Sequence, residues 1–501
     1  MSMPAKNLNP ILQRIDEFWQ AFKRSRKGTV GLLVLLLFAG ISIVAPAVSP
    51  YDPTESTYLA GTKAKPFWAR SLLGNERLSE NVMPIADPGF STGKSSLGSW
   101  LIETSLTLGA TVVDYYNEDG FERGSGRGCI VVTPPVEEVS YELVKATISK
   151  KFTYPFEGPP DRFTASLAAR VKNIGSASVK IASFISNASG YRFILWERSI
   201  TRDEGWFAPE YPIDSYSSRL RTTVFRDVLA DPASIIFSTS GEYAYGLEVS
   251  FSNLTPKPDF PPSVYLDDID LRLLGTAFGW LGTDQSGRDI FTQILYGARV
   301  SLTVGLLSAF ISVLVGLVVG SLSGYLGGFV DESLMRFAEI LLVLPQISLL
   351  LVLTAMLGRS SLNIILMIGL LGWMSFSRVI RSQVLSLKER PFIEAARAAG
   401  CGTLRILFRH IMPNLMSLAY VALALAVPAA ILAEAGLSWL GLGDPSAASW
   451  GRILHDATRY GAVREWWWVI PPGLCIALLS LSFIMIGYAV DEIFNPKLSK
   501  S

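Results

Sequence analysis

The sequence is poor in the residues on which many enzyme sites depend. Among its 501 residues are only two histidines, His410 and His455, and three cysteines, Cys129, Cys401 and Cys475, which lie far apart in the chain. No CxxC pair is present that would chelate a metal or carry redox chemistry. With so few histidines, a histidine-based zinc site or a Ser-His-Asp triad is almost excluded. The sequence therefore does not predict an enzyme.

Charged residues are also scarce. Asp, Glu, Lys and Arg make up 17% of the chain, whereas half of it is hydrophobic, and the mean hydropathy is +0.35. The formal net charge of +1 gives no reason to expect a nucleic acid as partner. This composition is typical of an integral membrane protein.

Six apolar stretches are candidates for helices that cross the roughly 30 Å hydrocarbon layer of a membrane. They are residues 29–48, 301–323, 337–357, 362–376, 415–433 and 467–490. A signal peptide is the less favoured interpretation of the first, because the run is too long and no small-x-small cleavage site follows it. The sequence predicts six transmembrane helices in the cell membrane.

Lysine and arginine collect at the amino terminus, between the fourth and fifth predicted spans, and in the carboxyl-terminal tail. Basic residues mark the cytoplasmic side. We therefore expect residues 1–28, the loop 386–414 and the tail 491–501 to be cytoplasmic. The large polar region between the first two spans is then external. It is divided into a linker (55–96), a folded domain (97–276) and an entry segment (277–300) that leads to a core of five spans (301–490).

The external domain alternates apolar and polar residues between clusters of Gly, Pro, Asn and Ser, a pattern typical of short antiparallel strands. We expect an all-β, jelly-roll-like sandwich. The segments with this pattern are 141–154, 162–174, 178–186, 191–200, 220–228, 242–254 and 263–274.

A polar stretch, "EAARAAGCGTLRILFRHIMPN" at 394–414, interrupts the apolar runs. It predicts a short helix, a bend at Gly400 and Gly402, and a second helix along the membrane surface, capped by Thr403 and ended by Pro413. From the residues alone, this is either a docking segment for a partner or an ordinary amphipathic loop helix.

The same stretch resembles the EAA loop of ABC-importer permeases, whose coupling helices dock into an ATPase subunit. Residues 281–306, 324–345, 432–454 and 471–480 are similar to the oligopeptide/dipeptide branch of that family. The resemblance implies two ATPase subunits, a second homologous permease and an extracytoplasmic solute-binding protein as partners, besides membrane lipid. The coupling residues that it implies are Glu394, Ala395, Ala396, Gly400, His410 and Pro413.

ATP hydrolysis is expected in the separate subunits, because "GFSTGKSS" at 89–96 spaces its glycines one residue too closely for a phosphate-binding loop. The resemblance favours short peptides as the transported solute. Oligosaccharides remain an alternative, with the external domain binding sugar or docking the binding protein. A membrane-anchored carbohydrate-binding or adhesion protein is a further alternative, although an anchor needs only one span.

Several charges lie within or beside the spans, where an unpaired charge is costly. Arg336 and Glu339 are three residues apart on one predicted helix face, and Glu434 ends the fifth span. They are candidates either for a substrate path or for structural ion pairs. The triplet Gly287, Arg288 and Asp289 recurs in the family, but the sequence assigns it no chemistry.

Two segments of the external domain, 119–132 and 261–274, are similar to the first and last strands of galactose-binding-like jelly rolls. This resemblance makes Glu122, Asp267 and Asp268 candidate ligands of a structural calcium ion, the only cofactor expected in this chain. Solvated turn charges are the alternative. Trp206, Phe207 and Tyr211 lie in a loop-like stretch and are candidates for a face that stacks on sugar rings or docks a partner protein.

Overall fold

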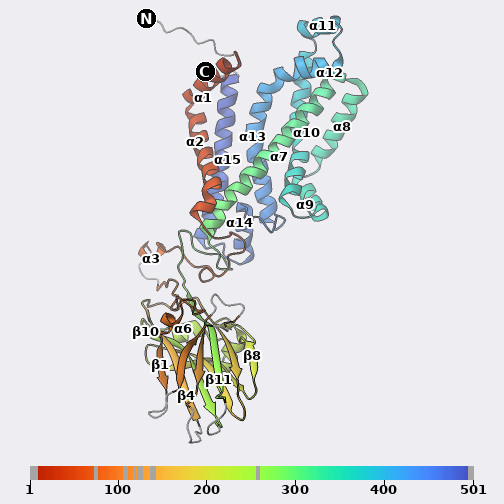
Figure 1. Ribbon diagram of the computed structural model, residues 1–501. Helices are drawn as coiled ribbons and strands as arrows, with labels where there is room; N and C mark the ends of the chain where they lie inside the picture. Colours follow the sequence, from red (N-terminus) through yellow and green to blue (C-terminus); the bar gives the residue numbers. More distant parts are fainter. Residues whose placement is uncertain are drawn as a thin grey trace. The chain divides into compact units, whose positions relative to one another are not determined.

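The computed structural model describes residues 10–72, 77–104, 111–117, 120–121, 128–135, 143–254 and 260–494. The chain forms two compact units (Figure 1). The helical unit comprises Met1–Thr57 and Asp289–Ser501, and the inserted unit comprises Tyr58–Arg288.

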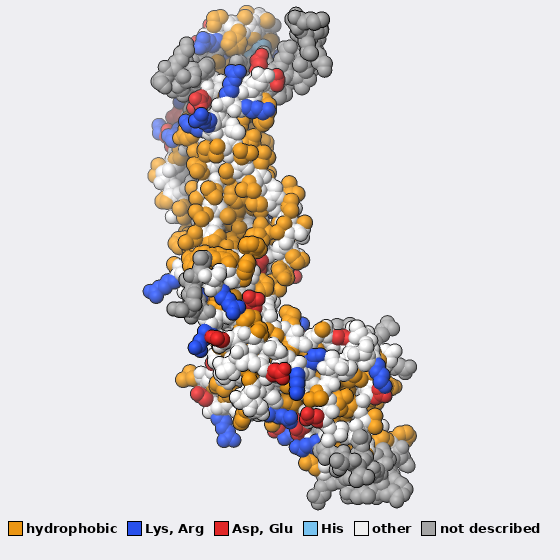
Figure 2. All heavy atoms as spheres, turned by 90° about the vertical axis from the view of Figure 1, so that its left-hand side faces the viewer, with side chains coloured by type: hydrophobic (Ala, Val, Ile, Leu, Met, Phe, Trp, Pro, Cys, Tyr) orange, Lys and Arg blue, Asp and Glu red, His pale blue; other side chains and the backbone are white. Residues whose placement is uncertain are grey.

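Five helical segments of the described chain are long and apolar enough to cross a membrane. They are α2 (Arg26–Val48), α7 (Ile290–Leu326), α10 (Ser361–Leu387), the continuous segment Thr403–Trp439, and α15 (Trp466–Phe494). On the face that carries α2, hydrophobic side chains form a broad band, with Lys and Arg side chains beyond its upper end (Figure 2). Leu33, Leu36, Leu37 and Ile43 of α2 are all exposed. Such an outward-facing apolar surface suits a lipid environment and confirms the predicted multi-span class.

The stretch predicted as the third span is not one straight helix. It contains α8 (Gly328–Val343) and α9 (Gln346–Leu357), which meet at an angle of 91°. Leu344 is extended, with ψ 135°, because the ring of Pro345 disfavours a helical conformation in the residue before it. Counted as one broken span, this pair brings the number of spans to six.

Helices α7 and α10 approach closely because α7 carries Gly316, Gly320 and Gly324 on one face, four residues apart. A Cβ atom added to Gly320 would lie 2.4 Å from the carbonyl oxygen of Ser377, and one added to Gly316 would lie 3.0 Å from that of Trp373. Gly324 repeats the contact one turn later. Small residues at this spacing allow two membrane helices to pack backbone against backbone.

The helix before the fifth span continues through Pro413, so the prediction that this proline ends it is wrong. Segment Thr403–Trp439 consists of α12 (Thr403–Ile406), a π-helical turn η1 (Leu407–Ile411) and α13 (Met412–Trp439). Pro413 lies in the first turn of α13, where its missing N–H is tolerated. The side-chain amide of Asn414 donates to the carbonyl oxygen of His410 at 2.6 Å.

Three shorter helices complete the described part of the helical unit: α1 (Pro10–Arg24), α11 (Pro391–Ala398) and α14 (Trp450–Arg459). Helix α2 packs on α15 through Gly28 and Gly31. A Cβ atom at Gly31 would lie 2.7 Å from the carbonyl oxygen of Ser482. The amino-terminal and carboxyl-terminal spans are therefore neighbours.

The described part of the inserted unit is a sandwich of two antiparallel sheets, which confirms the all-β prediction. The first sheet has the order β1 (Leu101–Thr104), β4 (Leu143–Tyr154), β10 (Gly241–Ser252), β6 (Ser178–Ser186) and β7 (Arg192–Ile200). The second has the order β2 (Val112–Tyr116), β3 (Cys129–Thr133), β11 (Ser263–Leu274), β5 (Arg162–Lys172) and β8 (Glu204–Phe207), with β9 (Ile213–Asp214) also on β5. Alternate side chains of both sheets, such as Tyr245, Phe251 and Leu266, form one buried core.

Two local predictions for the inserted unit are wrong. Residues 220–228 are not a strand: α5 (Ser218–Val224) occupies the first part, because Leu220 and Val224, four residues apart, pack toward the core as one helical face. Trp206 and Phe207 are not in a loop but in strand β8, which pairs with β5. Three more short helices, α3 (Ala69–Leu72), α4 (Lys94–Leu97) and α6 (Pro232–Ile236), lie in the connections.

Candidate functional site

Helix α11 is short, and a glycine follows its last turn. Pro391 lies in its first turn, where its fixed φ favours helix initiation. Gly400 follows the helix with φ +76°, a conformation that favours glycine. The N–H of Gly400 donates to the carbonyl of Arg397, and the N–H of Cys401 to that of Ala396, which together form a Schellman motif. The predicted bend is therefore at Gly400. Gly402 has an ordinary φ of −66° and precedes α12.

One side of α11 is anchored and the other is exposed. Ile393 is fully buried against Ile406 and Ile411, and Arg397 lies over the ring of Tyr325 at 5.3 Å. The exposed residues include Glu394 and Ala395 together with three large apolar side chains. These are Phe392 (44% exposed), Leu404 (64%) and Phe408 (61%). We call these five exposed residues the α11 face.

The α11 face lies at one end of the helical unit, where α11 and α12 form the tip (Figure 1). Several exposed large apolar side chains in one short segment that also carries a carboxylate and small alanines are typical of a protein contact surface. Ala396 is half-buried and packs on the cluster around Ile393, and His410 lies half-buried in the π turn. The structure therefore brings the predicted coupling residues to one end of the unit, with Glu394, Ala395 and Gly400 at the surface.

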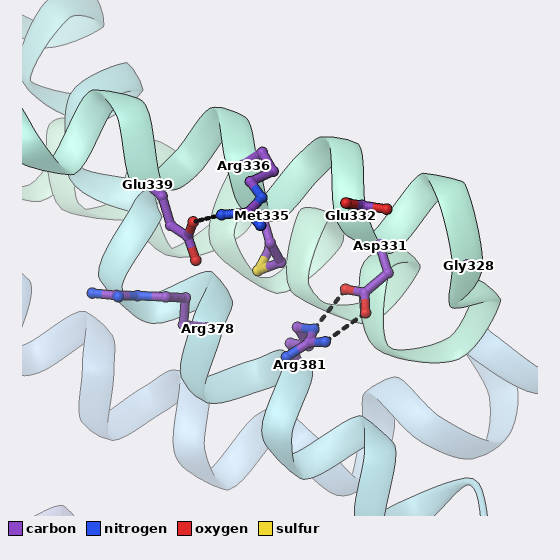
Figure 3. A pocket seen from close by; sticks show the side chains of 8 residues that line it. All are labelled: Gly328, Asp331, Glu332, Met335, Arg336, Glu339, Arg378 and Arg381. Atoms are coloured by element: carbon purple, nitrogen blue, oxygen red, sulfur yellow. Dashed lines mark hydrogen bonds and ion pairs between the residues drawn. The ribbon is translucent and has the colours of Figure 1, made fainter.

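A charged cluster between α8 and α10 was not predicted in full. Two guanidinium nitrogens of Arg381, Nε and Nη2, each donate a hydrogen bond of 2.5 Å to the carboxylate of Asp331 (Figure 3). The hydroxyl of Ser323 donates to the same carboxylate. Because the partners are 50 residues apart, no local spacing in the sequence indicates this pair. It ties α8 to α10 at the end where α8 begins.

The predicted pair of Arg336 and Glu339 forms an exposed ion pair in the same cluster, at 3.3 Å (Figure 3). An opening of about 300 Å³ separates the two pairs and is lined by Gly328, Asp331, Glu332, Met335, Arg336, Glu339, Arg378 and Arg381. An exposed ion pair contributes little to stability. The arrangement fits a structural or interfacial role for Arg336 and Glu339.

Glu434 and the Gly287–Asp289 triplet have local structural partners. Glu434 is buried in α13, and its carboxylate accepts a hydrogen bond of 2.6 Å from the hydroxyl of Ser438. Asp289 caps α7 by accepting from the backbone N–H groups of Phe291 and Thr292. Arg288 pairs with Asp284 at 2.7 Å. Gly287 has φ +69°, and a Cβ atom there would lie 2.5 Å from the carbonyl oxygen of Ala60.

The three aromatic residues predicted as an external ligand face have separate surroundings. The ring of Trp206 lies 5.9 Å from that of Phe121, and Phe207 packs on the core with Arg198 over its ring. Only Tyr211 lines the groove of about 540 Å³ that runs beside strand β7. Sequence reasoning missed that groove, because its lining combines strand β7 with Tyr211, Val224 and Phe225, which come together only in the folded chain.

Two of the three predicted calcium ligands, Asp267 and Asp268, lie among the described residues. Glu122 lies outside the described residues. Asp267 is fully buried, and its carboxylate accepts from the backbone N–H groups of Phe121 and Asp268, both at 2.8 Å. Burial raises the pKa of Asp267 to about 6. Among the described residues no group of three or more His, Cys, Asp or Glu side chains is placed to hold a metal. Calcium binding therefore stays a prediction.

Comparison with known proteins identifies the helical unit. Residues 316–500 match the family described as the binding-protein-dependent transport system inner membrane component, and residues 14–66 match the N-terminal TM domain of oligopeptide transport permease C. A putative peptide permease of Brucella suis is 40% identical over 239 residues, which cover 46% of this chain and 78% of that protein. The chain belongs to the peptide permeases of ABC importers.

Two further relatives match a similar share of this chain. The oligopeptide transport system permease OppC of Escherichia coli is 40% identical over 237 residues (46% of this chain, 78% of that protein). The dipeptide transport system permease DppC of Bacillus subtilis is 37% identical over 222 residues (44% and 69%). These relatives are permease subunits, and the ATPase of such importers is a separate subunit. This permease is accordingly a transport subunit and not an enzyme.

Solved structures give weaker likenesses. The MetNI methionine ABC transporter is 19% identical with a TM-score of 0.32, covering 40% of this chain and 96% of that one. TmCBM61, solved with β-1,4-galactotriose, is 13% identical with a TM-score of 0.23, covering 38% and 97%. Residues 67–315, which include most of the inserted unit, lie in neither of the two matched regions.

Proposed function

We propose that this permease imports short peptides delivered by an extracytoplasmic binding protein, in a complex with two ATPase subunits and a second homologous permease. The names of its relatives, oligopeptide and dipeptide permeases, support peptides as the solute. The α11 face supports the contact with an ATPase. A second permease is expected because this chain has only five or six candidate spans.

The basic residues of the segment after α10 support a cytoplasmic location for the α11 face. Both termini are then cytoplasmic, and the inserted unit is external. ATP binding by the paired ATPases presses on the α11 face and shifts the helices between outward-open and inward-open states. This shift requires that the ATPases contact the two states differently. The anchor of α11 on Ile406 and Ile411 supports this path, because it connects the face to the helix that continues as α13.

The observation that carries the proposal is the exposed, glycine-terminated α11 with its apolar neighbours. It also argues against a membrane-anchored carbohydrate-binding protein, which would need no such surface and no multi-span core. An oligosaccharide is the alternative solute, but Trp206, Phe207 and Tyr211 do not form the single aromatic face that would support it.

Co-purification of the permease with the ATPase subunits tests the proposal. Glu394→Lys reverses a charge on the α11 face, and Gly400→Trp places a large ring beside it. Gly358→Trp is the matched control, because Gly358 also has positive φ (+89°) with nothing within 4 Å of an added Cβ, but follows α9 at the other end of the helical unit (Figure 1).

We expect the wild type and Gly358→Trp to retain the ATPase subunits and both α11 variants to lose most of them. Equal retention by all four proteins would overturn the assignment of α11 as the coupling segment. Loss in the Gly358→Trp control as well would show that general destabilisation, and not the α11 face, explains the result.

A further inference from the structure

The groove beside strand β7, lined by Tyr191–Glu197 on one side and by Tyr211, Val224 and Phe225 on the other, has no assigned role. Seven consecutive residues of the chain form one wall, so the groove follows the strand over about 20 Å. Its volume of about 540 Å³ is in the range of ligand sites. We refer to it as the β7 groove.

Strand β7 is the last strand of its sheet. It pairs with β6 on one side, and no strand of the described chain pairs with it on the other. An edge strand presents backbone N–H and C=O groups at every second residue, which an incoming extended chain can pair with. The β7 groove therefore offers a row of backbone donors and acceptors.

Features around β7 limit what can pair with this edge. A bulge leaves Leu195 without a partner in β6, between Ile194 and Trp196. Arg192 and Glu197 place charged side chains along the edge. Bulges and edge charges both protect edge strands from pairing with copies of themselves.

Several aromatic rings of the groove already contact other side chains. The rings of Phe193 and Phe225 face one another at 5.9 Å with an interplanar angle of 25°. The guanidinium of Arg219 lies over the ring of Tyr211 at 4.3 Å. Tyr191 is 64% exposed, so the test below includes a sugar as well as peptides.

The two charged side chains that line the groove are also already paired. Arg192 bonds to Glu248 at 2.9 Å, and Glu197 to Lys180 at 2.8 Å. A charged terminus of a ligand therefore finds no bare countercharge at these two side chains. This part of the groove suits the uncharged middle of an extended chain, whose backbone supplies the hydrogen bonds.

We propose that the β7 groove binds short peptides in extended form, by adding the peptide as a further strand to β7. This inference rests on the proposed function in that it takes peptides as the solute. It gives the inserted unit a role of its own, which is to hold peptide at the external side of the permease.

Backbone methylation of the ligand tests strand addition directly. The purified full chain in lipid nanodiscs is titrated with a fluorescent pentapeptide of alternating valine and threonine, and with two versions N-methylated at alternate positions. Only one alternate set of N–H groups faces β7. One methylated version should therefore bind at least about tenfold more weakly than the parent, and the other about as well as the parent, since two or three hydrogen bonds are removed in one case only.

Matched variants locate the site. Val224→Trp fills the groove and should weaken binding by at least about tenfold, whereas Leu229→Trp places the same ring at an exposed position outside the groove lining and should leave it unchanged. Hydrogen exchange on the wild type provides a readout without any variant. The amides of Arg192–Ile200 should exchange more slowly when the peptide is bound.

Four results would overturn the inference. Equal binding of all three peptides, or no change in β7 exchange, would exclude strand addition. Binding of a galacto-oligosaccharide that Val224→Trp abolishes, without binding of peptide, would make the groove a sugar site. If the peptide does not bind the groove but is taken up by the reconstituted transporter, the groove inference fails while peptide import stands; if uptake fails as well, both fail.

Discussion

The close contact between helices α7 and α10 at Gly320 predicts a large effect from one added methyl group. In Gly320→Ala, the new Cβ atom would lie 2.4 Å from the carbonyl oxygen of Ser377 and 2.8 Å from Cβ of Ile380. Ordinary contacts of a Cβ atom begin near 3.4 Å. Helices α7 and α10 must therefore separate by about 1 Å at this point, a gap that forfeits a quarter to a half of the dispersion energy of the affected contacts.

Overpacking of this kind typically costs about 1–3 kcal/mol. For a unit of this size, about 2 kcal/mol corresponds to a fall in melting temperature of roughly 4–8 °C. Gly40→Ala is the matched control, because Gly40 is also in a membrane helix but an added Cβ there has nothing within 4 Å. Thermal denaturation of the detergent-solubilised protein, followed by intrinsic fluorescence, measures both variants. Similar melting temperatures for the two variants would refute the close packing of α7 on α10.

Ion pairs and one hydrogen-bonded carboxylate give further tests. Asp331→Ala and Arg381→Ala should each lower the melting temperature, with a coupling energy of about 1 kcal/mol in a double-mutant cycle; additive effects would show that the pair contributes nothing. Asp214→Ala should destabilise the inserted unit by about 3–5 kcal/mol in denaturant unfolding, because it leaves the largely buried Arg162 without its carboxylate partner, and Asp214→Leu with Arg162→Met should recover much of that loss. Burial opposes ionisation of Asp87, but hydrogen bonds from the 91–96 segment outweigh it and hold its pKa well below the usual range. Asp87→Asn should therefore be less stable than the wild type at pH 7. This difference should shrink as the pH falls below about 4, where the carboxylate's contribution is lost; a difference independent of pH would contradict this origin.

The spans could be predicted from the sequence because long apolar runs have few alternative structures. The break at Pro345 was also visible in the sequence, since a proline restricts the residue before it. The spacing of Gly316, Gly320 and Gly324 was a readable sign of close helix packing as well. By contrast, the continuation of the helix through Pro413 depends on a π turn just before it, and no residue pattern marks that turn.

In the inserted unit, strands with clear alternation were predicted well, and β6 has the predicted bounds. The segment around Leu220 also alternates apolar and polar residues, but it folds as helix α5. Packing of Leu220 and Val224 on the core favours the helical spacing over the strand spacing. The Asp331 and Arg381 pair and the β7 groove could not be predicted. Both join side chains from segments distant in the sequence, so they appear only once the chain is folded.

ATP-driven peptide uptake tests the central claim most directly. The permease is reconstituted with its second permease subunit and two ATPase subunits in proteoliposomes, and uptake of a radiolabelled peptide is measured with the binding protein and ATP. We predict uptake by the wild type and by Gly358→Trp, and little uptake by Gly400→Trp although this variant inserts normally into the membrane. Uptake by Gly400→Trp at the wild-type rate would contradict the claim that the α11 face couples ATP hydrolysis to transport.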